Sequence, residues 1–358
     1  MSSSGLSVGI VGLPNVGKST LFNALLKRQI ANVANYPFCT IEPNIGVVEV
    51  PDERLSVLAR IVNSQKIIPA IVKFVDIAGI VKGASMGEGL GNKFLSHIRE
   101  VSVICHVVRY FPDDKVLHVA GKVDPKNDIE IINSELILAD LETLDKQDTN
   151  PNRAKTDSEK HKLSAIGKLR KELNQGILAK NVLLTDEEKN AVNELQLLTM
   201  KPVIYVQNID EIQLTQFGAR AQNCAGDQLQ VCAKIEAELS ELSFEEQKEY
   251  LKQLGLDKSG LERLIQVAYK TLGLVSFLTA GEKEVRAWTI KNDTKAPKAA
   301  GVIHTDFEKA FIKAEIANFD DFVKYNGWVG VRHTGKVRFE GKEYVMQEGD
   351  VVDFRVGV

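Results

Sequence analysis

The stretch Gly12-Leu-Pro-Asn-Val-Gly-Lys-Ser19 decides the fold, because it matches the pattern G-x-x-x-x-G-K-[ST]. An apolar run at 6–11 precedes it, and residues 20–26 follow with the apolar spacing of a helix. In this strand–loop–helix order, backbone N–H groups surround phosphates at a helix N-terminus. The order therefore favours a nucleoside triphosphate site over a chance glycine-rich turn.

The residues of this loop have separate expected roles. Lys18 is expected to reach the β- and γ-phosphates and to act in catalysis, and the Ser19 hydroxyl is expected to ligate Mg²⁺. The residues predicted to contact the nucleotide here are Asn15, Val16, Gly17, Lys18, Ser19 and Thr20.

Length and composition indicate a soluble protein of two or three domains. The chain has 358 residues, 44% of them hydrophobic and 26% charged, with a net charge of −3. This charge predicts no global attraction to DNA or to anionic membranes. Its four cysteines lack C-x-x-C spacing, which argues against a zinc site or a disulfide framework. With no signal peptide and no membrane-spanning run evident, we expect a cytoplasmic protein, and a monomer.

Three sequence textures divide the chain. Residues 5–127 alternate apolar runs with glycine-rich loops, which predicts an α/β sheet with buried strands at 8–11, 45–50, 71–75 and 103–108. Residues 128–198 are rich in Lys, Glu, Leu and Ala and predict a helical, coiled-coil-like insertion. Residues 199–274 resume strand character and complete the α/β domain. Residues 275–358 predict a small α+β module.

Three short patterns predict helix starts. Thr185-Asp-Glu-Glu188 and Ser243-Phe-Glu-Glu246 are capping boxes, in which the hydroxyl and the later carboxylate each bond the other residue's backbone N–H. Thr305-Asp-Phe-Glu308 predicts a third cap, within the C-terminal module.

Two further motifs are typical of nucleotide-dependent switch proteins. Asp76 ends a predicted strand and can hold Mg²⁺, while the backbone N–H of Gly79 can bond the γ-phosphate. Thr40 lies between the phosphate-loop helix and the next strand and can ligate Mg²⁺ through its hydroxyl. The predicted metal ligands are therefore Ser19, Thr40 and Asp76. Each motif alone is also compatible with an ordinary turn.

Together these motifs resemble the YchF family of Obg-like ATPases. The matching stretches are the phosphate loop, Asn35-Tyr-Pro-Phe-Cys-Thr-Ile-Glu-Pro-Asn44, the segment that begins at Asp76, and Arg286-Ala-Trp-Thr-Ile290. The resemblance implies a G domain (5–127 plus 199–274), a helical insertion (128–198) and a C-terminal ubiquitin-like TGS domain (275–358).

The base specificity depends on the segment that begins at Asn208. GTP-binding relatives carry Asn-Lys-x-Asp, whose Asp accepts both guanine N–H groups, but here Ile209 and Glu211 replace the Lys and the Asp. The longer Glu side chain would misplace the guanine contacts, and Asn208 can serve an adenine edge instead. We therefore expect Asn208, Ile209 and Glu211 at the base. The resemblance implies a preference for ATP over GTP. Residues 231–234 would lie near the base or simply end a buried strand.

The hydrolysis step lacks one expected group. The residue after Gly79 is a Gln in small GTPases, but here it is Ile80, which predicts slow intrinsic turnover. The resemblance implies that His118 supplies the missing polar group, although a lone histidine is more often structural. Asn15 is similar to a residue that places K⁺ against the phosphates in relatives.

The resemblance implies ribosomes, with the large subunit as the contacted part, or RNA as the partner. Support from the residues is modest, because a basic patch in the C-terminal module competes with a mixed charged face. That patch would comprise Lys291, Lys295, Lys298, Arg332, Lys336 and Arg338. Two other functions stay open: an Obg-type GTPase, and a nucleotide-gated binding protein with incidental hydrolysis.

Overall fold

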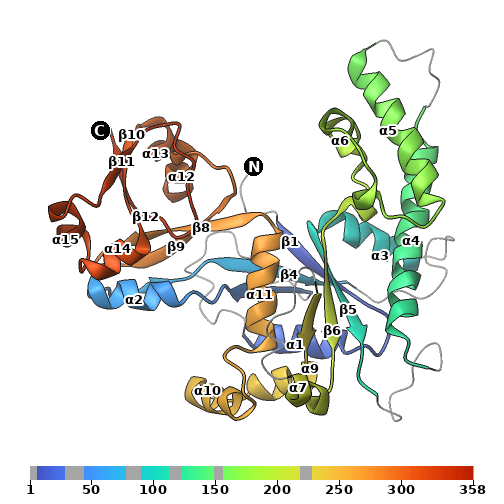
Figure 1. The fold of residues 1–358 in the computed structure, drawn as a ribbon, viewed down its shortest axis with the longest axis horizontal. Coiled ribbons are helices and arrows are strands. Elements are labelled where there is room, and N and C mark those ends of the chain that lie inside the picture. Colours follow the sequence, from blue (N-terminus) through green and yellow to red (C-terminus); the bar gives the residue numbers. More distant parts are fainter. Residues whose placement is uncertain are drawn as a thin grey trace.

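The structure is a computed structural model that describes residues 6–28, 44–77, 90–112, 122–148, 156–217 and 228–357. These residues form two six-stranded sheets with helices around them (Figure 1). No helix among the described residues is both long and apolar enough to cross a membrane.

The first sheet is the α/β sheet predicted from the apolar runs. Its strand order is β2-β4-β1-β5-β6-β7, and all neighbouring pairs are parallel except β2 with β4. All seven residues of β5 are buried, as expected for a parallel strand that is covered on both faces. The strands are β1 (Ser7–Val11), β2 (Ile45–Glu49), β4 (Ile71–Asp76), β5 (Val103–Arg109), β6 (Val203–Asn208) and β7 (Gln228–Val231).

The helices of this part present apolar faces to the sheet. In α11 (Gly260–Thr271), Leu261, Leu264, Ile265 and Ala268 are buried, which is the i, i+3, i+4, i+7 spacing of one helix face. The other helices are α1 (Lys18–Lys27), α3 (Leu90–Glu100), α7 (Glu211–Phe217), α9 (Ala233–Leu239) and α10 (Phe244–Gln253).

A group of helices between β5 and β6 projects away from the sheet (Figure 1). It consists of α4 (Pro125–Asp145), α5 (Asp157–Leu173), α6 (Asp186–Val192) and the 3₁₀ turns η5 (Ala179–Asn181), η6 (Asn193–Leu195) and η7 (Leu198–Met200). The group has an apolar cluster of its own, which includes Leu144, Ile166 and Leu169. At its root, buried Asp140 accepts hydrogen bonds from the backbone N–H groups of Leu198 (2.7 Å) and Thr199 (2.8 Å).

The second sheet belongs mainly to the C-terminal part of the chain. Its order is β11-β10-β12-β8-β9-β3. The strands are β3 (Ile67–Ile68), β8 (Leu274–Ala280), β9 (Val285–Lys291), β10 (Phe311–Ala317), β11 (Arg338–Glu340) and β12 (Val351–Val356). Its helices are α12 (Ala296–Ile303), α13 (Thr305–Lys309), α14 (Phe319–Lys324) and α15 (Trp328–His333).

One segment from the N-terminal part joins this second sheet. After β2, the chain forms α2 (Glu53–Ile61) and then β3, which pairs in parallel with β9. Buried Leu58 of α2 belongs to the same apolar cluster as Phe322, Val331 and Val351 of the C-terminal part. The two sheets therefore share a continuous core that passes through α2.

The helix starts are largely as predicted, with two differences. Both boxes, Thr185 with Glu188 and Ser243 with Glu246, form with reciprocal bonds. The prediction for Thr305 is wrong: the cap is His304, whose Nδ1 accepts the N–H of Asp306 (3.3 Å), and Thr305 is already helical. The helical region also begins earlier than residue 128, because Asp124 caps a helix that starts at Pro125.

Candidate nucleotide-binding site

The predicted site residues gather at one edge of the first sheet. The phosphate loop follows β1, Asp76 ends β4, Asn208 ends β6, and α9 begins after β7. Because β1, β4, β5, β6 and β7 are parallel, their carboxyl ends meet at the same edge. That edge is where open α/β sheets bind ligands.

The phosphate loop has a backbone that side chains would obstruct. Gly17 has φ +90°, and a Cβ there would lie 2.1 Å from Nδ2 of Asn208. A Cβ on Gly12 would lie 2.6 Å from the carbonyl oxygen of Val107 in β5. Asn15 also has a positive φ, of 62°. Both glycines are therefore required by close approach, as a loop that wraps phosphates with its main chain demands.

Lys18 is the first residue of α1 and points toward the end of β4. Its ammonium donates to Oδ1 of Asp76 at 3.0 Å and to the carbonyl oxygen of Ile77 at 2.9 Å. The two side chains are 11% and 23% exposed, so solvent screens this ion pair only in part. The structure thus brings together the predicted phosphate-binding cation and the predicted metal-binding carboxylate.

The oxygen atoms near Lys18 fit a magnesium site. Ser19 and Thr20 are exposed at the start of α1, and Asp76 is half-buried. Mg²⁺ takes hard oxygen ligands and is usually held by one or two protein groups plus substrate phosphates and water. Among the described residues, no group of three or more His, Cys, Asp and Glu gathers in a metal-binding arrangement.

Asn208 links the phosphate loop to the start of α9. It is buried, its Nδ2 donates to the carbonyl oxygen of Val16 (2.9 Å), and its Oδ1 accepts the N–H of Ala233 (3.0 Å). The side chain thus holds two main-chain segments in place. The sequence had suggested a base contact for Asn208 but not this clamp.

The residues after Asn208 separate into buried and exposed positions. The side chain of Ile209 is 3% exposed and lies in an apolar cluster with Leu214 and Ile235, so it presents no side-chain group to solvent. Asp210 and Gln213 cap α7 reciprocally: the N–H of Gln213 donates to Oδ1 of Asp210 at 2.7 Å, and the N–H of Asp210 donates to Oε1 of Gln213 at 3.0 Å. Glu211 is exposed at the first turn of α7.

Two buried groups in β5 were not predicted as part of the site. Arg109 is 1% exposed at the carboxyl end of the strand, and its Nε donates to the carbonyl oxygen of Phe111 at 3.1 Å. His106 is fully buried against Tyr205, and burial lowers the pKa of His106 to about 3. A neutral, buried His106 packed against Tyr205 fits a structural role.

The remaining predicted residues are outside this site or outside the described residues. Thr40, Gly79 and His118 fall in segments that the structure does not describe. In the C-terminal part, Lys295 pairs with Glu343, Arg332 with Glu315 and Asp353, and Arg338 with Asp350. The structure therefore favours the mixed charged face over the basic patch.

Comparisons with known proteins agree with this geometry. Residues 7–168 match a family described as 50S ribosome-binding GTPase, and residues 274–357 match the YchF-GTPase C-terminal family, described as a protein of unknown function. The Ribosome-binding ATPase YchF of Bacillus subtilis is 51% identical over 99% of this chain and 100% of its own length. The protein of the same name from Escherichia coli O157:H7 is 48% identical over 99% of this chain and 100% of its own length.

A solved structure gives the same result for the fold. The Schizosaccharomyces pombe YchF GTPase is 39% identical, with a TM-score of 0.85 over 99% of both chains. The relatives are matched over their full length, and a P-loop, a partly parallel sheet and a C-terminal α+β part are all present. The chain belongs to the YchF family.

Proposed function

We propose that this protein is a P-loop ATPase that hydrolyses ATP to ADP and phosphate and uses the hydrolysis as a switch. The observation that carries the proposal is the contact between Lys18 and Asp76 at the carboxyl edge of the sheet. It places a phosphate-binding cation and a metal-binding carboxylate beside one phosphate loop. Curated relatives that match the whole chain are named ATPases.

Hydrolysis in such a site depends on positioning and charge neutralisation more than on covalent chemistry. Lys18 would neutralise charge on the β- and γ-phosphates, and loop N–H groups would hold them in place. Ser19, Thr40 and Asp76 would hold Mg²⁺, which supplies further charge neutralisation when bound. We assign Asn15 to a K⁺ ion, Gly79 to sensing the γ-phosphate, and His118 to orienting the attacking water.

Base selection is assigned to the exposed carboxylate of Glu211. The capping bonds of Asp210 direct its carboxylate to α7, so Glu211 is the acidic group left to face a base. The names of the relatives differ on this point, since the Schizosaccharomyces pombe protein is named a GTPase. The alternative of an Obg-type GTPase therefore has a specific observation behind it and is decided by the same experiment.

The partner that we propose is the ribosome, at its large subunit, or RNA, bound by a cytoplasmic monomer. The name of the relatives, ribosome-binding ATPase, supports the ribosome as the partner. We propose the G domain at 5–127 and 199–274, the insertion at 128–198 and the TGS domain at 275–358. The insertion and the TGS domain would carry the contacts. Absence of co-sedimentation with ribosomes in every nucleotide state would contradict the partner assignment.

The decisive test of the base assignment is a Glu211→Asp variant. Replacing Ile209 by Lys at the same time is unsuitable, because the ammonium would be buried in the apolar cluster around Leu214. Glu211→Asp should raise GTP affinity roughly tenfold, because a correctly placed carboxylate satisfies two guanine N–H groups. Glu211→Gln is the matched control and should leave GTP weak. Competition binding with ATP and GTP checks this, and GTP preferred by the wild type would make the chain a GTPase.

A second measurement separates a switch from incidental hydrolysis. Lys18→Ala should abolish nucleotide binding and ribosome association together. In the switch model, a variant at His118 that binds ATP but does not hydrolyse it should stay associated with the ribosome. If cells tolerate that variant fully, the chain is instead a nucleotide-gated binding protein.

A further inference from the structure

The segment between β2 and β4 is built into the C-terminal part of the molecule, although its sequence lies within the α/β domain. The backbone N–H of Val285 donates to the carbonyl oxygen of Lys66 (2.8 Å). The backbone N–H of Gln65 donates to the carbonyl oxygen of Glu282 (2.9 Å). These bonds extend the parallel pairing of β3 with β9. One face of α2 packs in the core that contains Phe322 and Val351.

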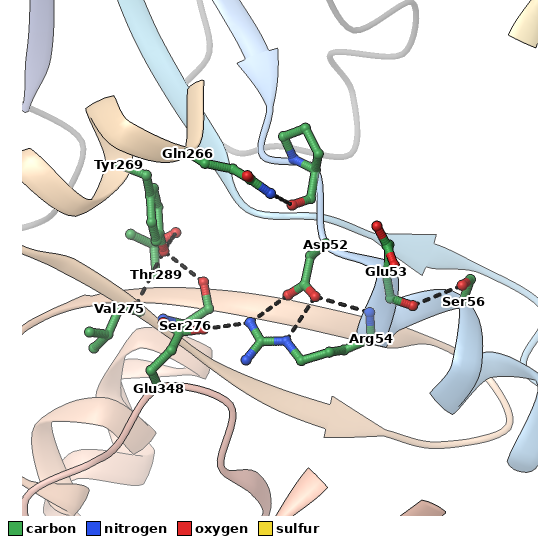
Figure 2. A network of polar contacts seen from close by, with 11 residues as sticks. Asp52, Glu53, Arg54, Ser56, Gln266, Tyr269, Val275, Ser276, Thr289 and Glu348 are labelled. Carbon is green, nitrogen blue, oxygen red and sulfur yellow. Dashed lines mark hydrogen bonds and ion pairs between the residues drawn. The ribbon is translucent and has the colours of Figure 1, made fainter. Parts of the chain in front are cut away.

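An ion bridge secures the start of the same segment (Figure 2). Arg54 donates to both carboxylate oxygens of Asp52, from Nε at 2.8 Å and from Nη2 at 2.7 Å. Nη2 of Arg54 also contacts Oε1 of Glu348, whose Oε2 accepts the N–H of Ser276 at 2.7 Å. Asp52 in turn caps α2 through the N–H of Arg54. We call Asp52, Arg54 and Glu348 the joint.

The surroundings of the joint limit its freedom. Gly349, next to Glu348, has φ +82°, and a Cβ there would lie 2.5 Å from Nη1 of Arg54. Burial alone would lower the pKa of Arg54, but the bonds and charges of Asp52 and Glu348 raise it above its usual value. Gln266 of α11 donates to the carbonyl oxygen of Pro51 (3.0 Å), just before the joint.

The strands that leave this joint lead directly to the nucleotide site. β2 and β4 pair from Glu49 with Ile71 to Ile45 with Val75, so they form one antiparallel ribbon. The far end of the ribbon is held by the C-terminal part. Its near end carries Asp76, bonded to Lys18. A paired ribbon transmits a shift at one end to the other more readily than two independent loops would.

We propose that the joint makes the C-terminal part a regulator of metal binding at the nucleotide site, through the β2–β4 ribbon. Arg54 and Glu348 are positioning residues in this scheme: they hold the far end of the ribbon so that Asp76 stays in register with the phosphate loop. Coupling between two sites is reciprocal, so ATP with Mg²⁺ must also change the joint. The inference rests on the proposed ATPase function and on the metal role of Asp76.

The experiment compares Arg54→Met and Glu348→Gln with a matched control, Glu343→Gln. The Gln at 348 still accepts the N–H of Ser276 but loses the charge that Arg54 meets. Glu343→Gln removes an exposed ion pair with Lys295, the residue that precedes α12. Each variant is assayed for ATP hydrolysis at saturating ATP over a Mg²⁺ series, and for thermal unfolding. A loss of stability alone would not move the Mg²⁺ requirement of the folded fraction.

We expect Arg54→Met and Glu348→Gln to raise the Mg²⁺ concentration for half-maximal rate by about two- to fivefold, the range of one partly exposed ion pair. Glu343→Gln should match the wild type, and Arg54→Lys should lie between. In the wild type, a non-hydrolysable ATP analogue should change hydrogen exchange at the amide of Ser276. A Mg²⁺ requirement equal to that of Glu343→Gln, with exchange at Ser276 unaltered by the analogue, overturns the inference.

The same hydrolysis assay, with Lys18→Ala added, separates this inference from the proposed function. If Lys18→Ala hydrolyses ATP as fast as the wild type, the assignment of the nucleotide site is wrong. If Lys18→Ala is inactive while the joint variants behave as the control does, the ATPase assignment stands and only the coupling fails.

Discussion

Asn208→Ala tests the assembly of the nucleotide site most directly. The substitution removes two hydrogen bonds of 2.9 and 3.0 Å in a side chain that is 4% exposed. It also leaves the carbonyl oxygen of Val16 and the N–H of Ala233 without their partner. A hydrogen bond contributes about 1 kcal/mol net, and a buried unsatisfied group costs about 1–3 kcal/mol. We expect the free energy of unfolding to fall by about 2–4 kcal/mol.

Nucleotide affinity should fall as well, because the two freed backbone groups belong to the phosphate loop and to the first residue of α9. A loss of at least about 1.4 kcal/mol of binding energy corresponds to a tenfold weaker Kd for ATP. Urea unfolding monitored by circular dichroism gives the first quantity, and titration calorimetry with ATP and Mg²⁺ gives the second.

Gln207→Ala is the matched control. Gln207 is the preceding residue of β6 and makes its side-chain bonds to Gln228 and Gln230, at 3.2 and 3.3 Å. Its surroundings are partly exposed, so its loss should cost less than about 1 kcal/mol and leave ATP affinity unchanged. The reasoning is refuted if Asn208→Ala binds ATP as the wild type does, or if Gln207→Ala weakens ATP equally.

Two further predictions concern stability. Burial lowers the pKa of His106 from 6.5 to about 3, so between these pH values the unfolded chain binds more protons than the folded one. The free energy of unfolding should therefore decrease as the pH is lowered through this range, by up to about 1.4 kcal/mol per pH unit. His106→Phe should make the free energy of unfolding depend less on pH between about pH 4 and 7, as measured by denaturant unfolding. An unchanged pH dependence would contradict the lowered pKa of His106. Asp140→Asn weakens the clamp on Leu198 and Thr199. The substitution should lower the free energy of unfolding by about 2–4 kcal/mol. Glu142→Gln, which removes an exposed ion pair with Lys146, should change it by almost nothing. Equal melting temperatures for the two variants would argue against a stabilising role of Asp140.

The sequence predicted the parts of the fold that depend on local pattern. The four predicted apolar runs coincide with strands β1, β2, β4 and β5 of the first sheet to within one residue. The signal is strongest in β5, because a parallel strand buried on both faces needs an unbroken apolar stretch. The capping boxes at Thr185 and Ser243 formed for the same kind of reason, since their bonds span three residues. Two further boxes, Thr156 with Glu159 and Ser259 with Glu262, carry the same sequence signal but were not predicted.

What the sequence did not predict depends on contacts between distant residues. β3 is two residues long and gains its partner from β9, more than two hundred residues later. The amide of Asn208 bonds Val16 across 192 positions. Neither pairing leaves a periodic trace near either residue, so propensity and spacing carry no information about them. The roles of Thr40, Gly79 and His118 stay predictions, because these residues fall outside the described segments.

The placement of α2 and β3 has a consequence for how a ribosome and ATP would influence each other. A partner that binds the C-terminal part also binds the part that holds the far end of the β2–β4 ribbon, whose near end carries Asp76. A partner that binds the ATP-loaded protein tenfold better must, by reciprocity, tighten ATP tenfold in return. The joint would carry part of that coupling. Arg54→Met should therefore weaken the ribosome affinity measured with ATP more than the affinity measured with ADP, so that the ratio of the two falls, whereas Glu343→Gln should leave the ratio unchanged.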